Sequence, residues 1–131
     1  MERTPINPWP WSLNLGYNQA EIIEGHRRLL VCSGQTAMDA DGNPQHPGDL
    51  RSQISMVLDN LEAVLDGAGM TFANIVRLNI YTIDVDQTLV NFEVMGARLS
   101  AAGVTPAMTL LGVTRLAFPE LMIELEATAV D

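Results

Sequence analysis

The C-terminal part of the chain holds the residues whose types and spacing best suit chemistry. In the run Met122-Ile123-Glu124-Leu125-Glu126-Ala127-Thr128-Ala129, two glutamates alternate with aliphatic residues. Because successive side chains of a strand point to opposite faces, Glu124 and Glu126 share one face. A glutamate whose pKa is raised by its surroundings can exchange a proton with water near neutral pH. The alternative is that both carboxylates belong to a solvated sheet face, and we interpret Glu126 as structural.

Other chemistries find little support in the sequence. Cys32 lies in an apolar run without an activating neighbour, which favours a buried, inert thiol. His26 and His46 are isolated by spacing, so we expect no metal site. The chain has no lysine for a Schiff base and no glycine-rich phosphate loop, and we therefore expect no cofactor.

Length and composition predict a single domain over residues 1–131. Hydrophobic residues make up 47% of the chain and charged residues 18%, which is enough for a substantial core. With 16 acidic and 7 basic residues the net charge is −9, so nucleic-acid binding is not expected. A single cysteine, no apolar run of roughly 20 residues and no signal-peptide core together predict a cytoplasmic protein that does not span a membrane.

Two helices are predicted from apolar spacing. Asp49 is a candidate N-cap, and apolar residues then recur at helical spacing over Leu50–Leu65 before Gly67 and Gly69. The second helix is predicted over Gln87–Ala102, with Asp84 or Asp86 as its cap and Gly103 as its end.

Strands are predicted at Asn14–Ile23, Arg27–Ser33, Ile75–Ile83, Ala107–Val113 and Leu121–Val130. Residues 1–11, rich in proline and tryptophan, suggest an irregular arm, and residues 39–49 a loop. The resulting order β-β-α-β-α-β-β predicts an α+β sandwich with both helices covering one sheet face.

Several short motifs occur in a characteristic order along the chain. They are Gly16-Tyr17 with Gln19, Ser33-Gly34-Gln35, Leu58-Asp59-Asn60-Leu61 with Ala68-Gly69-Met70, Asn74-Ile75-Val76-Arg77 with Tyr81-Thr82-Ile83-Asp84, Val90-Asn91, Thr105-Pro106-Ala107-Met108-Thr109 and the acidic run above. Their order and spacing resemble the RidA family, also known as YjgF/YER057c/UK114. The resemblance implies a chorismate-mutase-like fold with one mixed β-sheet, and a homotrimer with a central barrel and three clefts between subunits.

The resemblance also implies a chemistry for these clefts. Typical members hydrolyse imines or enamines there to ammonia and a 2-oxo acid, without a cofactor. A glutamate helps to position the attacking water, and it corresponds to Glu124, while Tyr17, Ser33 and Asn91 correspond to residues that line the cleft. From residue types alone, Tyr17 could equally pack with its hydroxyl in water, Ser33 could serve a turn, and Asn91 could be an exposed polar residue.

Met108 is the main departure from the family pattern. Typical members carry an arginine at this position that clamps the substrate carboxylate through a charged, bidentate fork, whereas methionine offers only apolar surface. Losing such a contact costs about 1.5–3 kcal/mol, or about ten- to a hundredfold in binding. Arg115 is the nearby cation that could replace it. We therefore predict an altered substrate preference.

Three functions are compatible with the sequence. The first is a RidA-like hydrolase for substrates without a clamped carboxylate, with Met108 in an apolar floor. The second is a module that binds a small molecule in the same cleft without chemistry, and the third is a structural or partner-binding trimer with a vestigial cleft. Retention of Glu124, Tyr17, Ser33 and Asn91 favours the hydrolase, because a decayed site would more often lose several of them.

Overall fold

In the computed structural model, which describes residues 1–131, the longest helix is α1 (Leu50–Gly67), where the sequence predicts it. Asp49 is its N-cap and accepts a hydrogen bond from the backbone N–H of Ser52 at 3.1 Å. Gly69, at φ +71°, follows the end of the helix in the left-handed conformation that glycine adopts readily. The predicted N-cap and the predicted glycine at the end of this helix therefore both have those roles in the structure.

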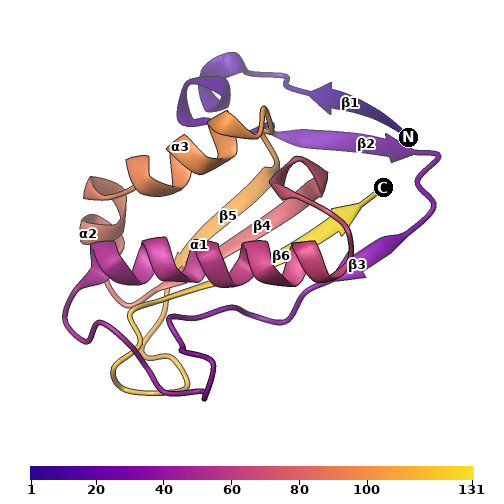
Figure 1. The fold of residues 1–131 in the computed structure, drawn as a ribbon. Coiled ribbons are helices and arrows are strands. Elements are labelled where there is room, and N and C mark those ends of the chain that lie inside the picture. The colour runs from indigo at the N-terminus through magenta and orange to yellow at the C-terminus, as the bar shows by residue number, and fades with distance from the viewer.

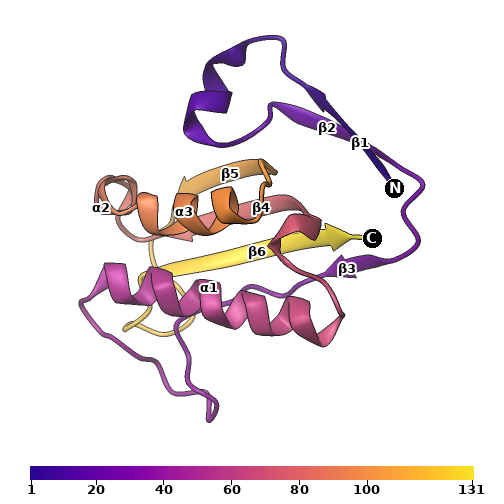
Figure 2. The same ribbon diagram turned by 45° about the horizontal axis from the view of Figure 1, so that its top comes forward.

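Helix α1 packs on a four-stranded mixed sheet with the order β3-β6-β4-β5. Its strands are β3 (Leu29–Val31), β4 (Ile75–Thr82), β5 (Ala107–Gly112) and β6 (Ile123–Val130). Strand β4 pairs in parallel with β5 and antiparallel with β6, and β3 pairs antiparallel with β6. Figures 1 and 2 show the helices on one face of this sheet, so the predicted α+β arrangement is confirmed.

The predicted second helix is divided into α2 (Val85–Val90) and α3 (Glu93–Ala101). Asp84 caps α2, with its carboxylate accepting from the backbone N–H of Gln87 at 3.0 Å. The prediction of one continuous helix was wrong at Asn91, whose side-chain Nδ2 donates to the carbonyl of Gln87 at 2.8 Å. Such local side-chain bonds compete with the helical ladder, which is interrupted at this position.

The N-terminal residues form a hairpin apart from the main sheet. Strand β1 (Glu2–Ile6) pairs antiparallel with β2 (Ala20–Glu24), and a 3₁₀ turn, η1 (Pro10–Leu15), lies between them. Figure 2 shows this hairpin lifted away from the main sheet. The predicted irregular arm over residues 1–11 was wrong at Glu2–Ile6, which forms β1. The predicted strand start at Asn14 was wrong because Pro10 begins the 3₁₀ turn and Gly16, at φ +84°, ends it.

Two contacts fix the hairpin to the rest of the chain. The Arg3 guanidinium donates to the carbonyls of Ala73 and Ile75, each at 2.9 Å. At its other end, the backbone N–H of Asn18 donates to the carbonyl of Thr105 at 3.2 Å. The second contact holds the neighbouring residue Tyr17 close to the start of β5.

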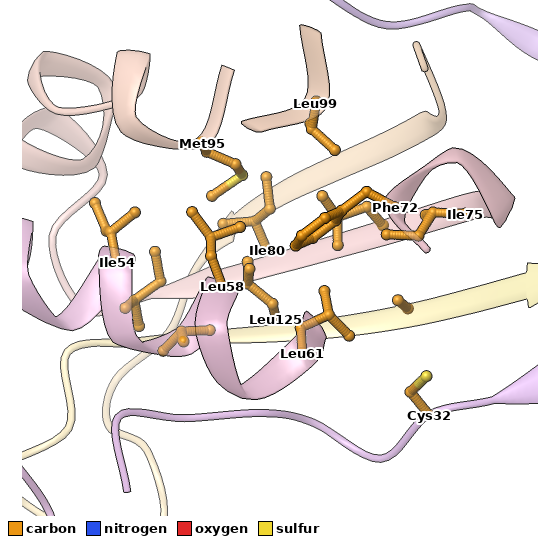
Figure 3. Close-up of a cluster of buried hydrophobic side chains, with 14 of the residues drawn as sticks. Cys32, Ile54, Leu58, Leu61, Phe72, Ile75, Ile80, Met95, Leu99 and Leu125 are labelled. Carbon is orange, nitrogen blue, oxygen red and sulfur yellow. The ribbon is translucent and has the colours of Figure 1, made fainter. Parts of the chain in front are cut away.

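The core lies between the helices and the sheet (Figure 3). It joins side chains from α1, α3, β4 and β6: Ile54, Leu58, Leu61, Met95, Leu99, Ile75, Ile80 and Leu125. Full burial of such side chains contributes about 1.5–3 kcal/mol each, which makes this apolar contact the main force that holds the helices to the sheet.

A buried glutamine connects α1 to the segment that enters β6. The Gln53 side chain is fully buried, and its Nε2 donates to the carbonyl of Glu120 at 2.8 Å. Its Oε1 accepts from the backbone N–H of Met122 at 2.8 Å. Because Met122 directly precedes β6, this pair of bonds helps to set the position of Glu124.

No helix of the chain has both the length and the apolar character needed to cross a bilayer.

Candidate functional site

Glu124 lies on the sheet face that the helices leave uncovered. Its neighbours Ile123 and Leu125 are fully buried on the opposite, helix-covered side. A Cβ atom added to Gly34 would lie 1.8 Å from Glu124 Oε1, so the carboxylate occupies space that only glycine leaves free. The two segments are joined by the backbone, since Gln35 N–H donates to the Leu125 carbonyl at 2.7 Å. We call this arrangement the Gly34 notch.

The two glutamates of β6 have different surroundings. Partial burial raises the pKa of Glu124, and the charge of Glu126 raises it further, with no hydrogen bond acting on that carboxylate. Glu126 Oε1 instead accepts from Asn79 Nδ2 at 2.9 Å and from the Tyr81 hydroxyl at 3.1 Å. Glu124 is therefore the carboxylate that is free to take a proton, and Glu126 is fixed in the sheet, in line with its interpretation as structural.

The Gly34→Ala variant is expected to push the Glu124 carboxylate out of the Gly34 notch. The end of that side chain is flexible, so the fold should persist while the carboxylate moves towards water and the pKa of Glu124 falls towards its ordinary value. An NMR titration of the glutamate side-chain carbonyls would measure this. Gly67→Ala is the control, because a Cβ there meets nothing within 4 Å. An unchanged Glu124 titration in Gly34→Ala would contradict the notch.

Tyr17 and Met108 lie together in an apolar hollow of about 510 Å³. Met108 is paired in register with Leu78, which is fully buried beneath the helices, so the Met108 side chain is on the helix side of β5. The Tyr17 ring packs edge-to-face against Trp11, with centroids 6.1 Å apart. Leu15, Ile80, Leu89, Phe92 and Leu110 also line the hollow.

The other candidates lie outside this hollow. Ser33 is exposed, directly precedes Gly34 in the chain and does not line the hollow. Asn91 does not line the hollow; its Oδ1 accepts from Arg51 Nη1 at 3.3 Å. Arg115 donates to the carbonyls of Leu116 and Ala117, beyond the far end of β5 from Met108. The strand alone separates Met108 from that end by about 13 Å, so Arg115 is poorly placed to replace the missing arginine.

One chain does not bring Glu124 and Met108 together. Glu124 pairs with Tyr81 of β4, whereas Met108 pairs with Leu78 of the same strand. Residues an odd number of positions apart on a strand face opposite sides, so the two side chains lie on opposite faces of the sheet. Glu124 and Gly34 form one group, and Tyr17 and Met108 form another.

Some residues of these two groups were not identified as functional from the sequence. Gly96 of α3 and Phe92 line the hollow, and Gly34 accommodates Glu124. Gly96 is an isolated glycine within the predicted helix, where glycine is less favourable than alanine, and this was the local signal that could have drawn attention to it. Nothing in the sequence pattern points to Phe92. The structure contains no cluster of three or more His, Cys, Asp or Glu side chains that could hold a metal ion.

Residues 13–131 match the family described as Endoribonuclease L-PSP. The chain therefore belongs to this family, which is the Rid/YjgF family, and the resemblance stated from its motifs is confirmed. A solved structure, a protein of unknown function of the Rid family named YyfB from Yersinia pestis, is 38% identical with a TM-score of 0.84, and the match covers 99% of both chains.

Two further relatives match over shorter stretches. The mitochondrial protein mmf2 of Schizosaccharomyces pombe is 38% identical over 86 residues, which are 66% of this chain and 64% of that protein. The 2-iminobutanoate/2-iminopropanoate deaminase of Rattus norvegicus is 30% identical over 70 residues, 53% of this chain and 49% of that protein. The match thus spans less than two thirds of the length of each.

Proposed function

We propose that the chain is a cofactor-free hydrolase of the imine- and enamine-deaminase type whose substrate preference is altered by Met108. The observation that carries the proposal is the Glu124 carboxylate in the Gly34 notch, partly buried, with a raised pKa and no protein group donating to it. A carboxylate in this state can accept a proton from water and return it within the same reaction.

The proposed reaction adds water to the imine carbon and then expels ammonia. Glu124 accepts a proton from the water as the water oxygen bonds to the imine carbon, and the imine nitrogen takes a proton from solvent to give a carbinolamine. Glu124 then gives its proton to the departing nitrogen. The C–N bond breaks, the hydroxyl returns a proton to solvent, and ammonia and a carbonyl compound are released.

The rat relative supports the reaction class, because it is named as a deaminase of two 2-imino acids. Those substrates carry a carboxylate, and the hollow beside Met108 offers no cation to pair with it. Leaving a carboxylate without a partner in an apolar pocket is costly. We therefore assign to this chain imines or enamines that present an uncharged group to Met108.

The proposed active form is a homotrimer with clefts between its subunits, as the family implies. In such a cleft, Glu124 of a second copy would lie at the hollow of the first. Glu124 of the same chain cannot do so, because it lies on the opposite face of the sheet from Met108. Apolar residues on the uncovered sheet face support this, since Leu29, Val31 and Leu111 are 59%, 72% and 50% exposed. Burying them between copies would remove apolar surface from water.

The test is ammonia release from a panel of freshly generated imines that differ in charge. We expect hydrolysis of imines with uncharged side groups, and kcat/KM lower by about ten- to a hundredfold for imines that carry a carboxylate. If no imine is hydrolysed faster than in buffer, the hydrolase proposal fails. The second candidate, a binding module without chemistry, then takes its place, because the hollow forms without any contribution from Glu124.

A further inference from the structure

We infer that the hollow beside Met108 binds an uncharged, apolar group of aromatic or branched aliphatic type. Next to this hollow lies a second one of about 390 Å³, and the two share Leu15, Gly16, Phe92, Gly96 and Met108 in their walls. We call the two together the Met108 trough. It runs along α3 and the start of β5 and is closed on one side by η1 and Gly16.

The lining of the trough determines the charge of its ligand. Neither hollow is lined by any Asp, Glu, Arg or His side chain, although the chain carries 16 acidic and 7 basic residues. A charged group that entered would lose hydration without gaining an ionic partner. An uncharged apolar group gives up little hydration free energy on entering, and its binding removes apolar surface of both the ligand and the trough from water.

The walls also give the shape and the polar contacts of the ligand. A Cβ added at Gly96 would meet nothing within 4 Å, so the space beside α3 is open up to the helix backbone. Phe92 and Met108 supply an aromatic ring and a polarizable thioether, which suit a flat or branched apolar body. Tyr17 and Asn14 are the uncharged hydrogen-bonding side chains of the larger hollow.

The size of the trough suits a small molecule. The larger hollow, at about 510 Å³, has the volume typical of ligand pockets. Binding of an uncharged ligand rests on the trough alone. Equating that ligand with the side group of the substrate rests on the proposed hydrolase function.

The test compares two fluorescent probes that differ in one charged group. N-phenyl-1-naphthylamine is uncharged, and 8-anilinonaphthalene-1-sulfonate is the same skeleton with a sulfonate. We expect saturable binding of the uncharged probe, with a dissociation constant at least about tenfold lower than that of the sulfonate. Equal affinity for both probes, or no saturable binding, would overturn the inference.

Gly96→Leu locates the binding in the trough. Its side chain would extend into open space, so we expect at least about a tenfold loss of affinity for the uncharged probe. Leucine forms helices better than glycine, so the variant should also melt at or above the temperature of the parent. Gly67→Leu is the matched control in α1, where a Cβ also meets nothing within 4 Å, and it should leave binding unchanged. Unchanged binding in Gly96→Leu would overturn the inference.

Two further measurements show whether a second copy occupies the trough and whether the hydrolase proposal holds. If probe binding falls as protein concentration rises and sedimentation shows the copies associating, a second copy occupies the trough and the inference fails. The second measurement is imine hydrolysis by the same protein preparation. If the probe binds but no imine is hydrolysed, the inference about the trough stands and the hydrolase proposal fails. If imines are hydrolysed but the probe does not bind, the hydrolase proposal stands and the inference about the trough fails.

Discussion

Replacing Glu124 with glutamine is expected to lower imine turnover by about 10²- to 10⁴-fold, the range that general acid–base catalysis contributes. Glutamine has nearly the same shape and can occupy the Gly34 notch, but its amide cannot take the proton of the attacking water. Substrate affinity should change by no more than a few fold, because the trough is untouched. Single-turnover rates and equilibrium binding of the same imine would separate the two effects.

The stability of this variant gives a control against misfolding. The pKa of Glu124 is raised in the folded chain, chiefly by burial. A carboxyl with a raised folded pKa stabilises the fold while it is protonated at low pH, and this contribution is lost as pH rises through that pKa. At neutral pH the ionised group is therefore unfavourable. Glu124→Gln should melt at the same or a higher temperature than the parent at pH 7, and a large drop would mean that lost turnover reflects unfolding.

Glu126→Gln is the matched variant for the second glutamate. The amide oxygen can still accept from Asn79 and Tyr81, so the sheet face should be preserved. The negative charge that adds to the rise in the pKa of Glu124 is lost, and that pKa should fall. Because Glu124 acts as a base when ionised, the acidic limb of the kcat/KM profile should move to lower pH. A shift to higher pH would contradict the assigned role of Glu124.

The sequence predicted those features that depend on neighbours along the chain. Helix α1 was found because Asp49, its apolar stripe and Gly69 all act within a few residues of one another. The alternation around Glu124 likewise identified which side chains share a face. The 3₁₀ turn was missed, although Pro10 and Gly16 were local signals for it, because the residues between them could also extend as a strand.

The site could not be assembled from the sequence, because its geometry depends on strand register. Which face Met108 takes depends on its pairing with Leu78 in β4, a contact across 30 positions that no local pattern reveals. The Gly34 notch depends in the same way on residues near position 34 lying beside β6. The motifs therefore identified candidate residues as a family set but gave no information on which of them meet within one chain.

Replacing Met108 with arginine is expected to raise kcat/KM for carboxylate-bearing imines by about ten- to a hundredfold, which corresponds to 1.5–3 kcal/mol for a charge-assisted contact. The new guanidinium would lie on the helix side of β5, in a trough to which its own chain contributes no carboxylate. It would thus be available to the substrate. The same change should weaken hydrolysis of imines with apolar side groups, because a charge now lines their pocket.

Met108→Leu separates charge from shape in this experiment. Leucine keeps the trough apolar at nearly the same volume, so the preference for uncharged imines should persist and no gain on carboxylates should appear. A double variant, Met108→Arg with Glu124→Gln, should bind carboxylate-bearing imines yet fail to hydrolyse them, because recognition and proton transfer are assigned to different residues. If Met108→Arg folds normally and gains nothing on carboxylates, Met108 does not face the substrate. The change in preference would then have to come from another part of the cleft.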